Sequence, residues 1–442
     1  METVLLYILG ILVIVVGLAL SIGLHELGHL VPAKLFGVKV GQYMIGFGPT
    51  LFSRRFGETE YGFKAFPLGG YISMAGMFPP ARPGGKPRTA STGFFDTAVQ
   101  EARMPFTGTI EAGTEERVFY KLAVWKRVVI MLGGPAMNLL IAIVLYAVLL
   151  VGFGIAQATT TVGSVSACVL PATSERQECR ADDRAAPAAA AGLVPGDRLV
   201  SINGTAIESW EQATATIRES PGDALSIVVE RNGAETKLTA TPLLTERYVR
   251  TANGTVVDGS DGVPITEEIG FLGIGPASEI VQQPLTAVLP AVGDNIVGVA
   301  KIILTLPQRL VDIANAAFGP GERDPNGPIS VVGVGRLAGE VASINTIPVA
   351  ERSAVLVGML ASLNVALFVF NLIPLPPLDG GHVAAALWEG IRRFFAKLFR
   401  RKDPGPIDSA KIIPITLAMV VIIGAVSALL IYADIVKPIS IF

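Results

Sequence analysis

The chain has 442 residues, a formal net charge of -2 at pH 7, and 51% hydrophobic against 16% charged residues, with a mean hydropathy of +0.55. Soluble domains rarely carry so much apolar sequence, so the composition indicates a membrane protein. The balanced charge offers no basic excess for nucleic acid, which leaves the lipid bilayer and other proteins as expected partners.

Four apolar stretches are near or above the roughly 20 residues that a helix needs to cross a bilayer. They are residues 4–33, 128–153, 354–374 and 412–432. The apolar character of the first continues past Glu26 and His29, whereas the apolar region of a cleaved signal peptide is about 7–15 residues long. We therefore expect this first stretch to stay in the mature protein.

Lys and Arg are concentrated in two segments, the one between the first two spans and the one after residue 390. In contrast, no Lys or Arg lies between Gly152 and Arg176. Because cationic loops tend to remain in the cytoplasm, this distribution predicts four crossings. Both termini and residues 155–353 are then expected outside the cytoplasm.

Residues 283–318 complicate the count, because they are apolar but interrupted by prolines and by Asp294, Lys301 and Arg309. We interpret them as a pair of amphipathic helices that lie on the membrane surface. The alternative is a fifth span, which would break the even count and move residues 319–353 inside.

The motif that carries chemistry lies within the first span and reads HELGH, residues 25–29. Its i, i+4 spacing puts His25 and His29 on one helical face with Glu26 beside them, which is the geometry of a zinc site. Zinc would leave a position for water and lower the pKa of that water toward ~7, with Glu26 as the general base. A chance match is the alternative, but such polar groups are costly at membrane depth and metal binding offsets that cost.

A third protein ligand is expected from “NLIPLPPLDGGH”, residues 371–382, where prolines end the third span. Asp379 and His382 are both candidates, and Glu389 is a weaker one. Residue chemistry alone does not separate Asp379 from His382. The competing interpretations are a helix N-cap for Asp379 and a plain polar residue in the next helix for His382.

HELGH, “GGPAMN” at 133–138 and “NLIPLPPLDGGH” occur in the order found in the site-2 protease family of intramembrane zinc metalloproteases. The chain resembles this family over nearly its whole length, and in particular the bacterial regulator of sigma-E protease and its actinobacterial relatives. The resemblance implies a multi-pass protease of the bacterial plasma membrane. With a rise of about 1.5 Å per residue, His25 lies roughly 13 Å from Lys34 along the helix, so the active site is expected near the cytoplasmic side. The resemblance also implies roles for individual residues: Zn2+ ligands His25, His29 and Asp379, catalytic base Glu26, and oxyanion-stabilising amide Asn371.

Three asparagines are open to a structural interpretation. The amide of Asn371 could instead satisfy backbone groups that the following prolines free, although an amide donor is suited to an oxyanion. Asn138 and Asn364 face the same ambiguity, and we favour a structural role for both.

Residues 67–76, “PLGGYISMAG”, predict a short Gly-rich hairpin in the cytoplasmic loop. In the family such an element lies in the membrane near the metal and pairs with substrate, which would suit a protease that must hold an extended backbone. An ordinary surface hairpin is the alternative. Residues 78–118, rich in Pro, Gly, Thr and charge, predict a flexible loop.

Residues 161–276 resemble a bacterial PDZ domain, with turn, strand and helix signals in “VPGDRLVSINGTAIESW” at 194–210. The sigma-E protease carries two such domains in tandem, whereas this chain has one. A small β-rich domain without peptide binding is the alternative. Cys168 and Cys179, the only cysteines, lie near its start on the side expected to be oxidising, so either a disulfide or two free thiols is compatible with the sequence.

The sequence therefore predicts a polytopic α-helical membrane protein with four transmembrane helices, a membrane-associated β-hairpin region and one extracytoplasmic PDZ-like α+β domain. The expected parts are 1–160 and 351–442 as two halves of the membrane core, 161–276 as the PDZ-like domain and 277–350 as amphipathic linker helices.

The predicted function is zinc-dependent cleavage of single-span membrane proteins. The resemblance implies that the substrate is an anti-sigma factor already shortened by another protease. The alternative is a non-catalytic membrane scaffold that binds zinc and recognises peptides. Glu26 favours the enzyme, because a binding-only site needs no base beside two histidines.

Overall fold

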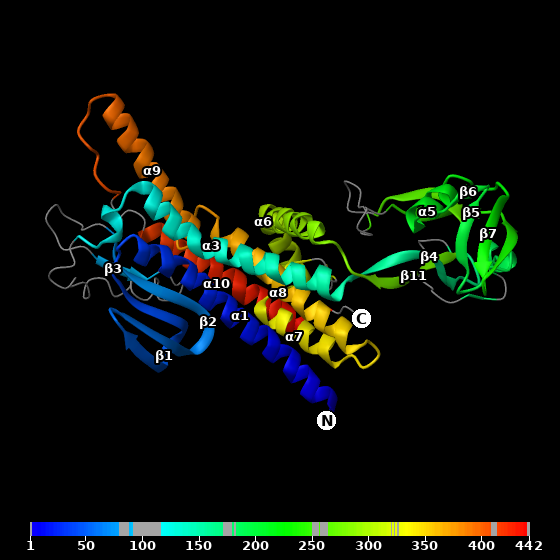
Figure 1. The fold of residues 1–442 in the computed structure, drawn as a ribbon, viewed down its shortest axis with the longest axis horizontal. Coiled ribbons are helices and arrows are strands. Elements are labelled where there is room, and N and C mark those ends of the chain that lie inside the picture. Colours follow the sequence, from blue (N-terminus) through cyan, green and yellow to red (C-terminus); the bar gives the residue numbers. More distant parts are fainter. Residues whose placement is uncertain are drawn as a thin grey trace. The chain divides into compact units, whose positions relative to one another are not determined.

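The computed structural model describes residues 2–78, 88–91, 116–170, 179–180, 183–249, 256, 264–319, 321, 323–324, 327–407 and 413–439. The chain divides into two compact units (Figure 1). One combines Met1–Phe153 with Pro284–Phe442, and the other is Gly154–Gln283. The first unit is therefore built from both ends of the chain.

Five helices in the described part of the first unit are long and apolar enough to cross a membrane. They are α1 (Glu2–Leu35), α3 (Val124–Ala147, extended by a π-helical turn over Val148–Phe153), α6 (Val288–Phe318), α8 (Val349–Asn371) and α10 (Ile413–Val436). Shorter helical elements are α7 (Val331–Ser343), α9 (Asp379–Leu398) and the 3-10 turns Phe119–Lys121 and Leu285–Ala287. The four predicted spans overlap α1, α3 with its π-helical turn, α8 and α10, although the third was predicted to end at residue 374 and α8 ends at Asn371.

Glycines allow the helices of this bundle to approach closely. A Cβ atom on Gly28 of α1 would lie 2.2 Å from the carbonyl oxygen of Gly133 on α3, and a Cβ atom on Gly133 would lie 2.0 Å from that of Gly28. At Gly10, near the other end of α1, a Cβ atom would lie 2.3 Å from the carbonyl oxygen of Ala338 on α7. Such small residues bring helix backbones together where lipid supplies no hydrophobic drive for association.

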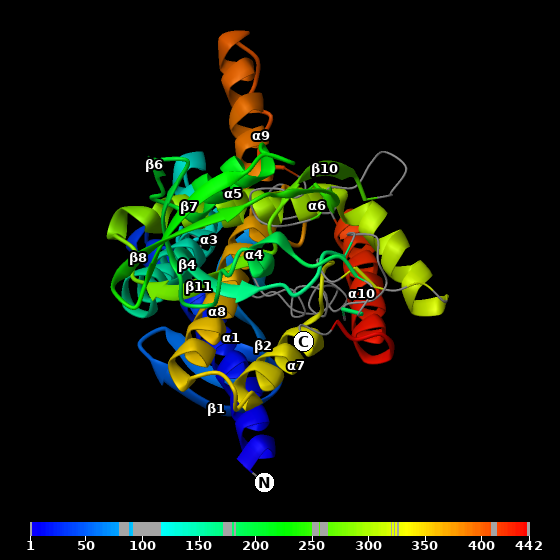
Figure 2. The ribbon, with the colours of Figure 1, turned by 90° about the vertical axis from the view of Figure 1, so that its right-hand side faces the viewer.

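The prediction of a helix pair over 283–318 is wrong, because α6 is one helix that continues through Pro307. Its first turns join an apolar cluster with Ala142 and Leu150 at the end of α3. Its last turns pack against Ala433 in the last turns of α10. Figures 1 and 2 show α6 crossing the bundle rather than running along α1 and α3.

A three-stranded sheet packs beside α1, with β1 (Val40–Phe56), β2 (Thr59–Phe78) and β3 (Arg88–Ser91) in that order. Residues 42–45 of β1 pair with residues 60–63 of β2 and also with residues 70–73. Residues 67–76 thus form no hairpin of their own, and belong to a long β2 that passes from one edge of β1 to the other. Of the predicted loop 78–118, residues 79–87 and 92–115 lie outside the described residues.

The second unit is mainly β-structure. Its sheet has the order β11-β4-β5-β7-β8, with β6 paired to β5, and β9 and β10 form a separate pair. The strands are β4 (Ile155–Val165), β5 (Arg198–Ile202), β6 (Thr205–Ala206), β7 (Leu225–Arg231), β8 (Ala234–Ala240), β9 (Leu243–Tyr248), β10 (Thr266–Phe271) and β11 (Ile274–Val281). Two helices, α4 (Pro187–Ala190) and α5 (Trp210–Arg218), accompany them. Cys168 and Cys179 form a disulfide, the first of the two states that the sequence allowed.

Candidate metal centre

Three side chains from distant parts of the sequence converge inside the first unit. His25 and His29 lie one turn apart on α1, and their Nε2 atoms are 3.2 Å apart. Oδ2 of Asp379, the first residue of α9, lies 3.2 Å from Nε2 of His25 and 3.3 Å from Nε2 of His29. Within the described ranges, this is the one group of three such side chains close enough to hold a metal ion.

The geometry of this cluster fits zinc. In a tetrahedral site, bonds of roughly 2.0–2.1 Å place the donor atoms about 3.3 Å apart, which matches the three separations. In addition, Oδ2 of Asp379 is buried and accepts no regular hydrogen bond from the described residues. Burying a carboxylate oxygen without a hydrogen bond is unfavourable unless a cation compensates its negative charge. The residues present therefore suit a two-histidine, one-carboxylate metal site.

Residues of α3 orient both imidazoles by contacting their Nδ1 atoms, which point away from the cluster. Nδ1 of His29 lies 2.8 Å from the carbonyl oxygen of Ile130, so Nδ1 must carry the proton and Nε2 is left with its lone pair toward the cluster. Nδ1 of His25 lies 3.2 Å from the amide of Asn138. The Oδ1 atom of Asn138 is buried without a partner among the described residues. Rotating this amide by 180° would pair Oδ1 with the Nδ1 proton of His25.

Gly134 explains how α3 comes so near the histidines. A Cβ atom at this position would lie 2.3 Å from Nε2 of His29 and 2.7 Å from Nε2 of His25. Any side chain would therefore occupy the space where the imidazoles face the cluster. The “GGPAMN” sequence thus supplies two glycines for close approach and one amide that contacts His25.

A cavity beside the cluster gathers the other predicted site residues. Glu26, His25 and Asp379 line it, together with Asn371 at the end of α8. Gly69 and Gly70 of β2 line the same cavity. A Cβ atom on Gly70 would lie 2.9 Å from Cγ of Glu26, so the strand passes close to this side chain. His29 is 0% exposed and forms the closed side of the cluster.

The remaining candidates have different surroundings. His382 lies outside the three-residue cluster. Glu389 is 2% exposed and pairs with Arg127 of α3 instead of approaching the cluster. Asn364 donates to Oγ of Ser21 at 3.0 Å, which links α8 to α1. No pattern in the sequence marked Arg127, whose partner Glu389 is 262 positions away.

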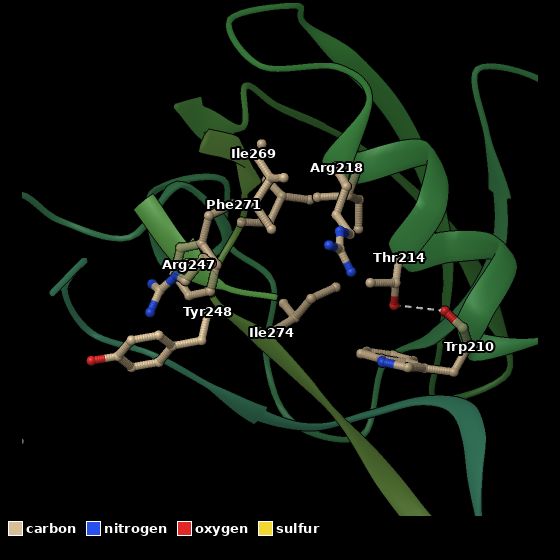
Figure 3. Close-up of a pocket in the computed structure, with 12 residues that line it drawn as sticks. Trp210, Thr214, Arg218, Arg247, Tyr248, Ile269, Phe271 and Ile274 are labelled. Atoms are coloured by element: carbon tan, nitrogen blue, oxygen red, sulfur yellow. Dashed lines mark hydrogen bonds between the residues drawn. The ribbon is translucent and has the colours of Figure 1, made fainter. Parts of the chain in front are cut away.

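A second cavity, in the other unit, is a groove between α5 and the β9–β10 pair (Figure 3). Trp210, Thr214 and Arg218 face it from α5, and Ile274 lies at its centre in the view. On the opposite wall, the guanidinium of Arg247 stacks 3.8 Å from the centre of the Phe271 ring. Its lining is mostly apolar, with cationic groups on both walls. An extended peptide could therefore contact this groove through side chains of both kinds.

Comparisons with known proteins show that the chain is similar to a family of peptidases. The sequence model of peptidase family M50 matches residues 13–401. The zinc metalloprotease Rip1 of Mycobacterium tuberculosis strain H37Rv is 33% identical over 448 residues, which cover 99% of this chain and 100% of that protein. Rip1 of Mycolicibacterium smegmatis is 33% identical over 454 residues, covering 98% and 99%. The metalloprotease MmpA of Caulobacter vibrioides is 27% identical over 399 residues, covering 87% and 88%.

The match spans most of the chain, and the Rip1 relatives exceed 30% identity over nearly all of it. The long apolar helices of the first unit agree with a multi-pass membrane protein. Its cofactor is Zn2+, as the curated relatives named zinc metalloproteases imply. The chain belongs to peptidase family M50 and is a zinc metalloendopeptidase of the site-2 protease type.

Proposed function

We propose that this protease cleaves single-span membrane proteins within or near the bilayer, with zinc held by His25, His29 and Asp379. The observation that carries the proposal is the convergence of these three donor atoms, two of them on the long apolar helix α1 and the third at the start of α9. They lie next to a cavity that is also lined by Glu26 and Asn371. When bound, zinc activates a water molecule toward a peptide carbonyl.

The side chains around the cavity divide the remaining work. Glu26 accepts a proton from the attacking water and delivers it to the departing amine. The amide of Asn371 donates to the oxyanion that develops on the carbonyl. Gly69 and Gly70 present a strand backbone at the cavity, which supports pairing with an unwound segment of the substrate. This pairing would satisfy the N–H and C=O groups that the substrate helix loses.

Glu26 separates the protease from the rival function, a non-catalytic zinc-binding scaffold. Full-length Glu26→Gln protein should retain one zinc ion per chain and lose cleavage of a reconstituted single-span substrate. His25→Ala serves as the matched control and should lose both zinc and cleavage. If Glu26→Gln protein lost zinc as completely as His25→Ala, the assignment of Glu26 as base would be wrong; if it cleaved normally, the proposed mechanism would be wrong.

For the substrate, we infer a membrane anti-sigma factor that another protease has already shortened outside the membrane. The support is the likeness to site-2 proteases of this type, together with the groove of the second unit, which suits an extended peptide. A panel of single-span proteins with and without their ectodomains would test this preference in reconstituted membranes. Equal cleavage of both forms would contradict a requirement for prior shortening.

For the topology, we propose that α1, α3, α8 and α10 cross the membrane with both termini outside, and that α6 lies on the outer surface. The support is that both ends of α6 pack near the C-terminal ends of α3 and α10. No free cysteine exists in the described structure, so single cysteines introduced at Leu289 and Phe318 can be labelled selectively. Both should react with a membrane-impermeant maleimide from outside. Reaction from opposite sides would establish a fifth crossing.

A further inference from the structure

A buried ion pair joins the two helices that frame the metal cluster. Nη1 of Arg127 on α3 donates to Oε2 of Glu389 on α9 at 3.1 Å, and Nη2 donates to Oε1 at 2.8 Å. The two side chains are 6% and 2% exposed. This two-pronged geometry fixes direction as well as distance, since the planar guanidinium matches the carboxylate fork.

The cost of this pair suggests a purpose other than stability. Taking both charges out of water costs several kcal/mol per ion, and apolar residues of similar volume often replace such pairs without loss of stability. Apolar contacts alone would not fix a unique register of α9 on α3. α9 packs mainly on α3, and a single apolar interface allows small shifts along or around the helix. The Arg127–Glu389 pair removes that freedom.

The register of α9 matters because its first residue is Asp379. Glu389 follows Asp379 by ten positions, which corresponds to about 15 Å along the helix. A small rotation of α9 about α3 would therefore move the carboxylate of Asp379 relative to the histidines. In contrast, the contacts at 3.2 and 3.3 Å require its placement within a fraction of an ångström.

α3 also holds the histidines, so it serves as the common reference for all three donor groups. Its Ile130 carbonyl accepts from His29, and Arg127 lies about one helical turn before Ile130. We propose that Arg127 and Glu389 are positioning residues that lock α9 onto α3 so that Asp379 meets His25 and His29. This inference rests on the proposed role of Asp379 as a zinc ligand.

Two further ion pairs provide controls. Arg393, one turn after Glu389 on α9, also contacts its carboxylate at 3.1 Å, but it is 38% exposed and belongs to the same helix. Arg323 and Asp434 form a second buried pair, 4% and 3% exposed. Asp434 belongs to α10 and also accepts from the backbone N–H of Ser330, away from the metal cluster. Breaking either control interaction should leave the register of α9 unchanged.

The test compares Glu389→Gln with Asp434→Asn in full-length protein, using zinc affinity by chelator competition, the visible absorption of bound Co2+, and thermal stability. Both variants lose one buried charge and should lower the melting temperature. Only Glu389→Gln should also weaken zinc binding, by about 10–100-fold, and change the Co2+ spectrum. Arg393→Ala should match the parent protein in both metal readouts.

Arg127→Lys provides a second variant, since it retains the charge but loses the two-pronged geometry. Arg127→Lys should weaken zinc binding less than Glu389→Gln does. If Glu389→Gln does not fold, the zinc affinity of Arg127→Lys tests the inference in its place. Unchanged zinc affinity and an unchanged Co2+ spectrum in the folded variants would overturn the inference. Asp379→Asn, measured alongside, distinguishes the ligand role of Asp379 from the positioning role of Arg127 and Glu389. If Asp379→Asn retains zinc, the ligand assignment fails. If only Asp379→Asn loses zinc, the ligand assignment stands and the positioning role is refuted.

Discussion

Gly134 lies directly against His29, with space for hydrogen but none for a methyl group. A Cβ atom at Gly134 would come within 2.3 Å of Nε2 of His29, the atom that faces the metal cluster. Because His29 is fully buried and held from behind by Ile130, it cannot move away without breaking that hydrogen bond. The close approach of α3 to α1 is therefore part of the metal centre as well as of the helix packing.

Gly134→Ala should consequently abolish or strongly reduce zinc binding while the protein remains in the membrane. Gly358→Ala on α8 is the matched control, because a Cβ atom there would lie 3.5 Å from Cδ2 of Leu149, an ordinary contact distance. That control should bind zinc normally, and its helix should gain up to about 1 kcal/mol from the better helix former. Zinc content after dialysis against a mild chelator measures both variants. Full zinc retention by Gly134→Ala would show that the helices can separate without cost.

Asp379→Asn should weaken zinc binding far more than His382→Ala, because Asp379 lies in the donor cluster and His382 does not. Losing the carboxylate removes a bond and a compensating negative charge together. Zinc stoichiometry under the same chelator conditions compares the two proteins. A larger loss in His382→Ala would make that histidine the better candidate for the third ligand.

Asn138→Ala should weaken zinc binding by about 10–100-fold, which is the usual cost of removing a group that orients a ligating histidine. The reason is that His25 would lose the only described partner of its Nδ1 atom and with it a fixed ring orientation and tautomer. Asn364→Ala is the control, since this buried amide contacts Ser21 rather than a histidine. Equal zinc affinities in the two variants would return Asn138 to a purely structural role.

Removing residues 161–276 should preserve cleavage of a short single-span substrate and increase cleavage of one with an intact ectodomain. β4 and β11 form a paired ribbon in which Ala158 is opposite Ser278, so a short turn can close the cut ends. The physical reason is the expectation that the second unit excludes substrates with a bulky ectodomain and takes no part in bond cleavage, so its removal should widen access. Both substrates should be compared in membranes, with Glu26→Gln as the blank. Loss of activity toward the short substrate in a zinc-loaded deletion would show that this unit takes part in productive binding.

The second unit should lose stability in acid through Asp197. Arg231 hydrogen-bonds this carboxylate through two nitrogens, at 2.7 and 2.8 Å, and so lowers the pKa of Asp197 below its ordinary value. Since the folded-state pKa is the lower one, this stabilisation is complete above the ordinary pKa of about 3.9 and is lost as the pH falls through that value toward the folded-state pKa.

Hydrogen exchange of β5 and β7, corrected for intrinsic rates, measures this loss. Asp197→Asn should be less stable at neutral pH and should show a weaker decline in acid, whereas the exposed Asp223→Asn should behave like the parent protein. An unchanged acid response in Asp197→Asn would contradict the assignment.

The local sequence was sufficient to predict the features that depend on neighbouring residues alone, namely the apolar helices and the spacing of the two histidines. The four predicted spans overlap long helices, because a continuous apolar run of about 20 residues favours a helix in a bilayer without reference to its neighbours. The pairing of His25 and His29 followed in the same way from the helical repeat, since four positions make about one turn. The resemblance to known motifs favoured Asp379 over His382 and added Asn371, and both Asp379 and Asn371 line the cavity next to Glu26.

Interactions between distant segments required the tertiary structure. The prolines and charged residues of 283–318 predicted a pair of helices, yet α6 is one helix that continues through Pro307. One proline removes a single hydrogen bond, and packing at both ends maintains the helix. Glu389 was open to interpretation as a ligand until α3 placed Arg127 beside it, and Asn138 had no visible partner until α3 met α1 at Gly28 and Gly133. The sequence by itself identified candidate residues for binding a metal and for accepting a proton from water. Only the folded chain decided which carboxylate meets the histidines, because that choice depends on helix register across residues hundreds of positions apart.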